Sequence, residues 1–158
     1  MLTLERDCLR ITETVYQSIL RDLGGQPLEC GGILGADQSG VVSAWYFDRT
    51  GKSSHNSYKP DVIAINRVLQ EEWQPSGIYM LGIAHSHTAG KNVPSCGDIH
   101  YGIRILEALD TTDTFYLPIL ELSETRQTLF AFILYKNSQE QYQCRQITCQ
   151  ISCSKRHM

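Results

Sequence analysis

Three kinds of segment are missing from this chain of 158 residues, and each absence argues against a class of protein. No apolar stretch approaches the roughly 20 residues that a membrane-spanning helix requires. No targeting segment is visible, because the charged residues Glu5, Arg6 and Asp7 follow the first four residues at once. Lys and Arg form no run and the formal net charge is -3, unlike a nucleic-acid-binding or membrane-surface protein. We therefore expect a cytoplasmic protein with no nucleic-acid partner and no membrane partner.

The composition predicts one globular domain. A hydrophobic content of 42% in 158 residues is sufficient for a single core. We assign residues 1–158 to this domain, with its core at about residues 8–136 and a C-terminal strand and tail over residues 137–158. The six cysteines are expected to remain thiols, because the cytoplasm is reducing.

The most specific pattern in the sequence is H-x-H-x(7)-S-x(2)-D, formed by His85, His87, Ser95 and Asp98. It follows an apolar run, residues 77–84, that predicts a buried strand. Side chains two residues apart in a strand point to the same face, so both imidazoles can bind one metal ion. Asp98 can supply a third ligand, which leaves one position of a tetrahedral zinc free, as in catalytic zinc sites. Chance produces the full pattern in roughly one chain in two thousand of this composition, so the signal is specific.

A purely structural interpretation of the same residues stays open. Ser95 and Asp98 have the spacing of a capping box, which would begin a helix that runs to about Leu109. His85 and His87 would then be ordinary half-buried strand residues. The two interpretations are compatible in part, because a helix N-terminus that positions Ser95 can also present Asp98 as a metal ligand.

An acidic residue, Glu29, lies at the edge of an apolar strand within a predicted hairpin, residues 27–47. Gly31 and Gly32 follow it and allow another backbone to approach closely. Glu29 is either a solvated strand end or, beside a zinc site, a general acid/base for an attacking water and a leaving amine.

Together these residues resemble the JAMM signature of the JAB/MPN metalloproteases, particularly the short prokaryotic JAB branch. The likeness covers about residues 8–136, from E-C-G-G-I-L-G at Glu29 through H-S-H to Ser95 and Asp98. The resemblance implies that His85, His87 and Asp98 bind one catalytic Zn²⁺, that Glu29 is the general acid/base, and that Ser95 stabilises the oxyanion. One position departs from the family pattern: proline usually follows the second histidine, whereas this chain has Thr88.

The expected fold is α/β. Strands and helices are predicted in the order βαββαβαββ, which implies a mixed sheet with helices on both faces. The resemblance implies a three-layer MPN (JAB) domain with a cytidine-deaminase-like architecture.

We expect one strand over residues 115–122 and a mobile polar loop over residues 48–60. Family members place such a segment beside the substrate channel, so Asn56 and Tyr58 are candidate substrate contacts. The next helix is predicted to bury a stripe, Val62, Ile65, Val68, Leu69 and Trp73.

The resemblance also implies a substrate class: the peptide or isopeptide bond after the C-terminal glycine of ubiquitin or a ubiquitin-like protein. Prokaryotic members accompany ubiquitin-like conjugation or antiphage systems, so conjugation enzymes are expected partners, and the role is deconjugation or precursor processing. Two rival functions remain. One is a sulfur-carrier-processing peptidase that releases cysteine or a small adduct, and the other is a non-catalytic MPN scaffold.

Other metal and thiol chemistries are less well matched. A zinc deaminase needs H-x-E and P-C-x-x-C, which are missing here, and a thiol protease built on Cys96 would leave the paired histidines unexplained. The C-terminal residues Cys144, Cys149, Cys153 and His157 could bind a second metal, but their spacing lacks the C-x(2)-C of structural zinc sites. A terminal strand followed by a frayed end is the alternative.

Overall fold

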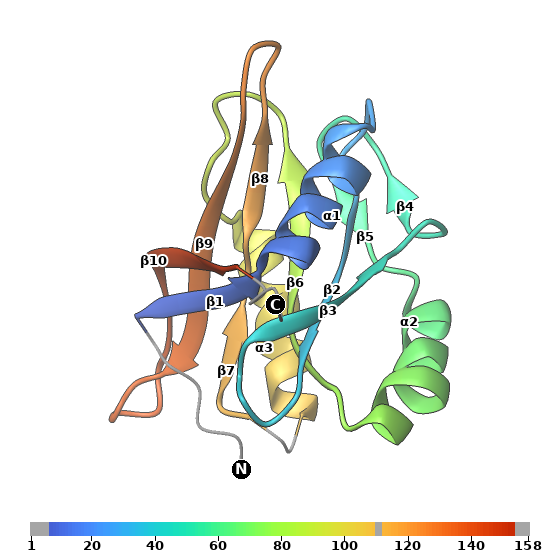
Figure 1. Cartoon of the computed structure of the whole chain (residues 1–158). Coiled ribbons are helices and arrows are strands. Elements are labelled where there is room, and N and C mark those ends of the chain that lie inside the picture. Colours follow the sequence, from blue (N-terminus) through green and yellow to red (C-terminus); the bar gives the residue numbers. More distant parts are fainter. Residues whose placement is uncertain (1–6, 110–111, 154–158) are drawn as a thin grey trace.

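The computed structural model of this protein describes residues 7–109 and 112–153 (Figure 1). Its centre is an eight-stranded sheet in the order β10-β1-β3-β2-β6-β7-β9-β8. Strand β10 also pairs with β9, so the sheet closes on itself, and it combines parallel and antiparallel pairs. The strands are β1 (Cys8–Thr12), β2 (Gly31–Ala36), β3 (Val42–Phe47), β6 (Tyr79–His87), β7 (Thr114–Tyr116), β8 (Ile119–Leu122), β9 (Gln127–Lys136) and β10 (Tyr142–Ser152).

Helices cover both faces of this sheet, as predicted. Helix α1 (Glu13–Gly24) packs Val15, Ile19 and Leu23 into one core cluster with the strands. Helices α2 (Val62–Val68) and α3 (Cys96–Ala108) contribute to a second cluster on the other face. Figure 1 shows α1 in front of the sheet and α3 behind it. The expected α/β architecture of a mixed sheet between helices is therefore confirmed.

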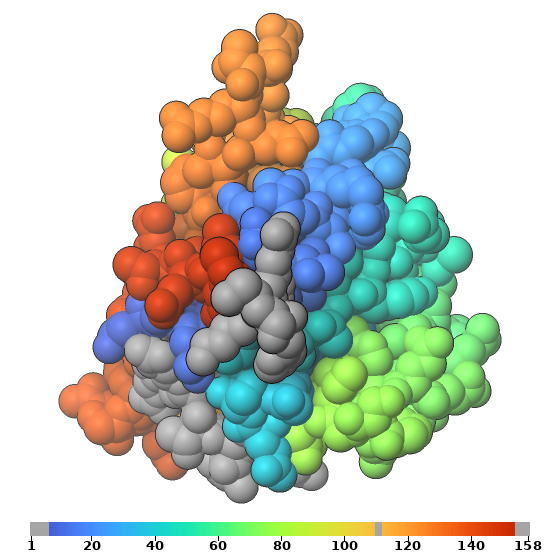
Figure 2. Space-filling model, in the orientation of Figure 1, coloured from blue at the N-terminus to red at the C-terminus, as the bar shows by residue number. Residues whose placement is uncertain are grey.

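The hairpin that joins β8 to β9 projects from the body of the molecule (Figure 2). Strand β8 runs parallel to the end of β6, and His87 is paired with Glu121. No helix in the described parts of the chain has the length and apolar character needed to cross a bilayer.

The second helix differs from its prediction in its first turn and in its helical period. Val62 was expected in the buried stripe, yet it is 52% exposed, whereas Ile65, Val68 and Trp73 are buried as predicted. Helix α2 continues as a π-helical turn (Leu69–Trp73) and a 3-10 turn (Gln74–Ser76). The wider turn changes the helical period, so Trp73 reaches the sheet beside Gly35 while the first turn stays outside the core.

The predicted strand over residues 115–122 is in fact two strands, β7 and β8. Pro118 lies between them and has no N–H for a sheet hydrogen bond, while its carbonyl accepts from the N–H of His85 at 3.2 Å. Strand β6 therefore pairs first with β7 and then with β8. The segment expected to be a mobile loop contains another hairpin, β4 (Lys52–Ser53) and β5 (Tyr58–Lys59).

The C-terminal strand argues against the second metal site. Cys144 packs in the cluster on the α3 face and Cys149 in the cluster on the α1 face, so the sheet separates them. Burial raises the pKa of both thiols, for Cys149 to about 11, which disfavours the thiolate that a metal requires. Cys153 is exposed, and His157 lies outside the described residues. Cys144 and Cys149 therefore do not ligate one ion.

Candidate metal centre

The two histidines of the sequence pattern lie side by side at the end of β6. Both are buried, with 4% of His85 and 6% of His87 exposed. Their Nε2 atoms are 2.9 Å apart, because alternate side chains of a strand share one face. Strand β6 holds them rigidly, since it pairs with β2 on one side and with β7 and β8 on the other.

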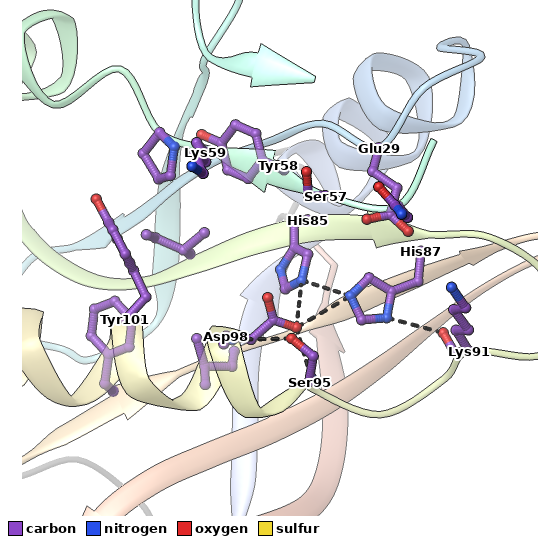
Figure 3. Close-up of a pocket in the computed structure, with 16 residues that line it drawn as sticks. Glu29, Ser57, Tyr58, Lys59, His85, His87, Lys91, Ser95, Asp98 and Tyr101 are labelled. Carbon is purple, nitrogen blue, oxygen red and sulfur yellow. Dashed lines mark hydrogen bonds and ion pairs between the residues drawn. The ribbon is translucent and has the colours of Figure 1, made fainter. Parts of the chain in front are cut away.

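Asp98 completes the cluster from the first turn of α3 (Figure 3). Its Oδ2 lies 3.1 Å from Nε2 of His85 and 3.2 Å from Nε2 of His87. The capping box is also present: the Ser95 N–H donates to Oδ2 of Asp98 at 2.8 Å, and the Asp98 N–H donates to Oγ of Ser95 at 3.1 Å. The structural and the ligand interpretations of Asp98 therefore describe the same geometry, in which the cap aims the carboxylate at the histidines.

The three atoms fit a tetrahedral metal ion. Zinc bonds to nitrogen and oxygen are about 2.0–2.1 Å long, so two ligands of one tetrahedron lie about 3.3 Å apart. The three separations in the cluster, 2.9, 3.1 and 3.2 Å, are close to this edge. Within the described residues, His85, His87 and Asp98 are the group of three ligand atoms found close enough to hold an ion. Two imidazoles and a carboxylate favour zinc or a similar transition metal over magnesium or calcium.

A neighbouring carbonyl selects the tautomer of His87 that a metal needs. Nδ1 of His87 lies 3.2 Å from the carbonyl oxygen of Lys91, which can only accept a hydrogen bond. Nδ1 therefore carries the proton, and the lone pair is left on Nε2, which faces the cluster. A turn presents this carbonyl: the Lys91 N–H donates to the Thr88 carbonyl at 3.1 Å, and Gly90 takes a φ of 85°. The turn orders the loop at Thr88, where the family pattern has proline.

The electrostatics of the cluster favour a bound cation. Burial by itself would raise the pKa of Asp98, but hydrogen bonds from His85 and His87 outweigh it and hold this pKa well below its usual range. Burial would lower the pKa of His87, but the hydrogen bond and charge of Asp98, with a contribution from Glu29, raise it overall. Asp98 is consequently an anion that draws either a proton or a metal ion between itself and the two imidazoles.

Glu29 and Ser95 lie on opposite sides of this cluster. Glu29 is 4% exposed and precedes β2, and its N–H donates to the Ser54 carbonyl at 2.8 Å. Figure 3 shows its carboxylate on the side of His87. Ser95 is exposed at the rim, and its hydroxyl accepts the N–H of Asp98, so its own proton can be donated to a ligand.

One cleft of about 330 Å³ is lined by every residue predicted for the catalytic metal site and for substrate contact. Its lining includes Asn56 and Tyr58 as well as the acid, the serine and the three metal-ligand candidates. Sequence reasoning missed Lys59, Lys91 and Tyr101, which also line it. It also missed Asp48, whose carboxylate accepts a hydrogen bond from Tyr58. A carboxylate at the edge of an apolar strand, the signal that identified Glu29, would have found it.

Ser86, between the two histidines, points to the opposite face and holds the segment that carries Glu29. Its Oγ accepts the N–H of Cys30 at 3.1 Å, and its own N–H donates to the Cys30 carbonyl at 2.9 Å. Ser86 is fully buried, so no water can replace a lost partner. Strand β6, which carries His85 and His87, therefore also fixes the position of the candidate acid/base Glu29.

We expect Ser86→Ala to lower the free energy of unfolding by about 1–3 kcal/mol, because the buried N–H of Cys30 loses its acceptor. Urea denaturation followed by circular dichroism measures this loss. Ser43→Ala, at an exposed position of β3, is the matched control and should change stability by less than about 0.5 kcal/mol. Equal midpoints for the two variants would contradict the role assigned to Ser86.

The fold and the site define a JAB-type α/β domain with a candidate metal centre, a class compatible with hydrolase activity. A family model described as prokaryotic homologs of the JAB domain matches residues 12–145, and the chain belongs to this family. The chain is also similar to the solution structure of protein DSY2949 from Desulfitobacterium hafniense, with a TM-score of 0.68 and 18% identity, covering 94% of this chain and 95% of that one. At this identity the similarity supports the fold alone. We find no significant match among curated proteins.

Proposed function

We propose that this chain is a zinc-dependent peptidase or isopeptidase that cleaves after the C-terminal glycine of ubiquitin or a ubiquitin-like protein. The observation that carries the proposal is the convergence of His85, His87 and Asp98 within hydrogen-bonding distance, beside a buried carboxylate in the same cleft. A scaffold protein has no need of such a set, and here every member is present. When bound, zinc would supply Lewis acidity and would lower the pKa of water at this site.

Glu29 and Ser95 would carry out proton transfer and stabilisation of the oxyanion, respectively. Glu29 accepts a proton from the attacking water and returns it to the departing amine. Ser95 donates a hydrogen bond to the oxygen of the scissile carbonyl as negative charge develops there. Among the described residues, Glu29 and Asp98 are the only carboxylates that line the cleft, and Asp98 already contacts both histidines. Glu29 is therefore the residue that can move the proton.

The substrate class rests on the membership of the prokaryotic JAB family. A glycine-ended tail would reach the metal centre as an extended chain through the cleft. We place the reaction in deconjugation or precursor processing within a bacterial ubiquitin-like conjugation or antiphage system. Conjugation enzymes of that system are the expected partners.

A second candidate, release of cysteine or another small adduct from a sulfur carrier, is favoured by one feature. Lys59 and Lys91 line the cleft and could hold the free carboxylate of a small leaving group. An isopeptide-linked protein has no such carboxylate at the leaving amine. Turnover of small adducts without cleavage between proteins would favour this candidate.

A substrate trap tests the proposal. Glu29→Ala should keep the three ligands and lose turnover, so bound substrate should remain on the protein during purification from its native host. Mass spectrometry is expected to find a small glycine-ended protein, or its conjugates, enriched on this variant. Asp98→Asn, which keeps the helix cap but weakens the metal site, is the control. If Glu29→Ala holds zinc but no glycine-ended protein copurifies with it, the result would count against deconjugation.

A further inference from the structure

We propose that Tyr58, held in place by Asp48, is the specificity-determining residue of this site and limits the residue before the scissile bond to glycine. The inference rests on the proposed function, because it concerns the substrate of that reaction. Tyr58 belongs to β5 and lines the cleft next to the metal-ligand candidates (Figure 3). Its ring is stacked toward the imidazole of His85, with centroids 6.5 Å apart and planes at 28°.

The ring of Tyr58 cannot move away from the cleft, because the backbone supports it at two glycines. A Cβ atom at Gly31 would lie 2.5 Å from Cε1 of Tyr58, and one at Gly51 would lie 2.7 Å from Cε2. Contacts under 3.0 Å are essentially never seen for real Cβ atoms. The absence of both side chains lets the ring fit closely against the chain, so the ring acts as a fixed wall rather than a mobile lid.

Asp48 fixes the other end of the side chain. The Tyr58 hydroxyl donates to Oδ2 of Asp48 at 2.6 Å, and the same oxygen accepts the N–H of Asp61, the N-cap of α2, at 2.9 Å. Asp48 is only 2% exposed and follows β3, so one buried carboxylate links β3, β5 and α2. Burial, together with the hydrogen bond to Asp48, raises the pKa of Tyr58 far above its usual value. The phenol therefore stays protonated and remains the donor.

The lining of the cleft also includes Tyr101 from α3 and the apolar residues Ile83, Phe115 and Leu117. A chain that approaches His85 through this cleft passes beside Tyr58. Because Tyr58 is fixed next to His85, a side chain on the residue at the metal centre would meet its ring. Glycine has no Cβ and avoids this contact. The restriction thus comes from Tyr58, and Asp48 is a positioning residue that acts through it.

Peptide binding tests this inference without any turnover. The probes are acetylated hexapeptide amides that end in Gly-Gly, Gly-Ala or Gly-Val, titrated against the zinc-loaded full chain carrying Glu29→Gln and followed by NMR. We expect the glycine peptide to bind about tenfold more tightly than the valine peptide, the discrimination that one or two carbon atoms in a tight site commonly give. Adding Tyr58→Ala or Tyr58→Leu should reduce this ratio to about twofold or less. Tyr58→Leu retains an apolar contact with the glycines in case Tyr58→Ala does not fold.

Conservative variants separate positioning from simple stability. Asp48→Asn keeps an acceptor oxygen for the Tyr58 hydroxyl and should retain most of the preference for glycine. Tyr58→Phe and Asp48→Ala each remove the hydrogen bond that holds the ring, so both should weaken the preference at unchanged zinc content. An unchanged preference in Tyr58→Ala or Tyr58→Leu, or no binding of any probe to the protein with Tyr58 intact, would overturn the inference. If the wild-type enzyme cleaves no glycine-ended protein while these binding ratios hold, the proposed function fails and the inference about Tyr58 stands.

Discussion

Glu29→Gln is expected to lower the rate of cleavage about 10²–10⁴-fold, the usual contribution of a general acid/base, while one zinc ion per chain is retained. Glutamine keeps the size of the side chain but cannot accept the proton of water. Glu29 is buried beside His87 and is no part of the three-atom ligand group, so metal binding and proton transfer are separable here. Single-turnover cleavage of a ubiquitin-like precursor with an extension after its terminal glycine measures the rate, and atomic absorption measures zinc.

Glu121→Gln is the matched control for this experiment. Glu121 is paired with His87 in the sheet but does not line the cleft. We expect this variant to retain activity within a factor of about two, as for a substitution outside the reacting groups. A fully active Glu29→Gln enzyme would contradict the assignment of Glu29, and an equal loss in both variants would point to a general effect of charge near the histidines.

The parts of the structure that the sequence predicts well are those determined by local spacing. Paired histidines at the end of an apolar run require only the alternation of a strand. The spacing of Ser95 and Asp98 requires only the first turn of a helix, and the structure has both the cap and the ligand geometry that this spacing allows. One short motif therefore predicted the part of the site built from β6 and α3.

The parts that the sequence did not predict depend on contacts between distant segments or on a change of helical period. Nothing near Cys144 indicates that β10 closes the sheet by pairing with β1, because the partner is more than a hundred residues away. The π-helical turn at Leu69–Trp73 breaks the regular spacing from which Val62 was assigned to the core. The link from Asp48 to Tyr58 crosses a polar segment whose composition indicates only a loop. Each of these features arises from tertiary packing.

Asp98→Asn is expected to abolish the stabilisation of this protein by zinc. At a zinc concentration about 1,000 times its dissociation constant, binding to the folded state adds about 4 kcal/mol. For a chain of this size that corresponds to a rise of about 8–16 °C in the melting temperature. Asparagine can still accept the N–H of Ser95, so the capping box is kept, but the anion between the two imidazoles is lost. Calorimetry with and without zinc measures the shift for each protein.

Asp98→Asn separates the interpretation of Asp98 as a helix cap from its interpretation as a metal ligand, because the substitution keeps the cap and removes the anionic ligand. If Asp98 serves only as a helix cap, wild-type protein and Asp98→Asn should show the same small response to zinc. If it is a ligand, the wild-type shift should vanish in Asp98→Asn, while the metal-free proteins differ by no more than about 2 kcal/mol, the scale of one helix cap. Ser95→Ala is the reciprocal control: it removes the hydroxyl that caps α3 but leaves His85, His87 and Asp98 unchanged. Without zinc, Ser95→Ala should have a lower free energy of unfolding than the wild-type protein. It should still be stabilised by zinc, because the carboxylate of Asp98 and not the Ser95 hydroxyl binds the metal.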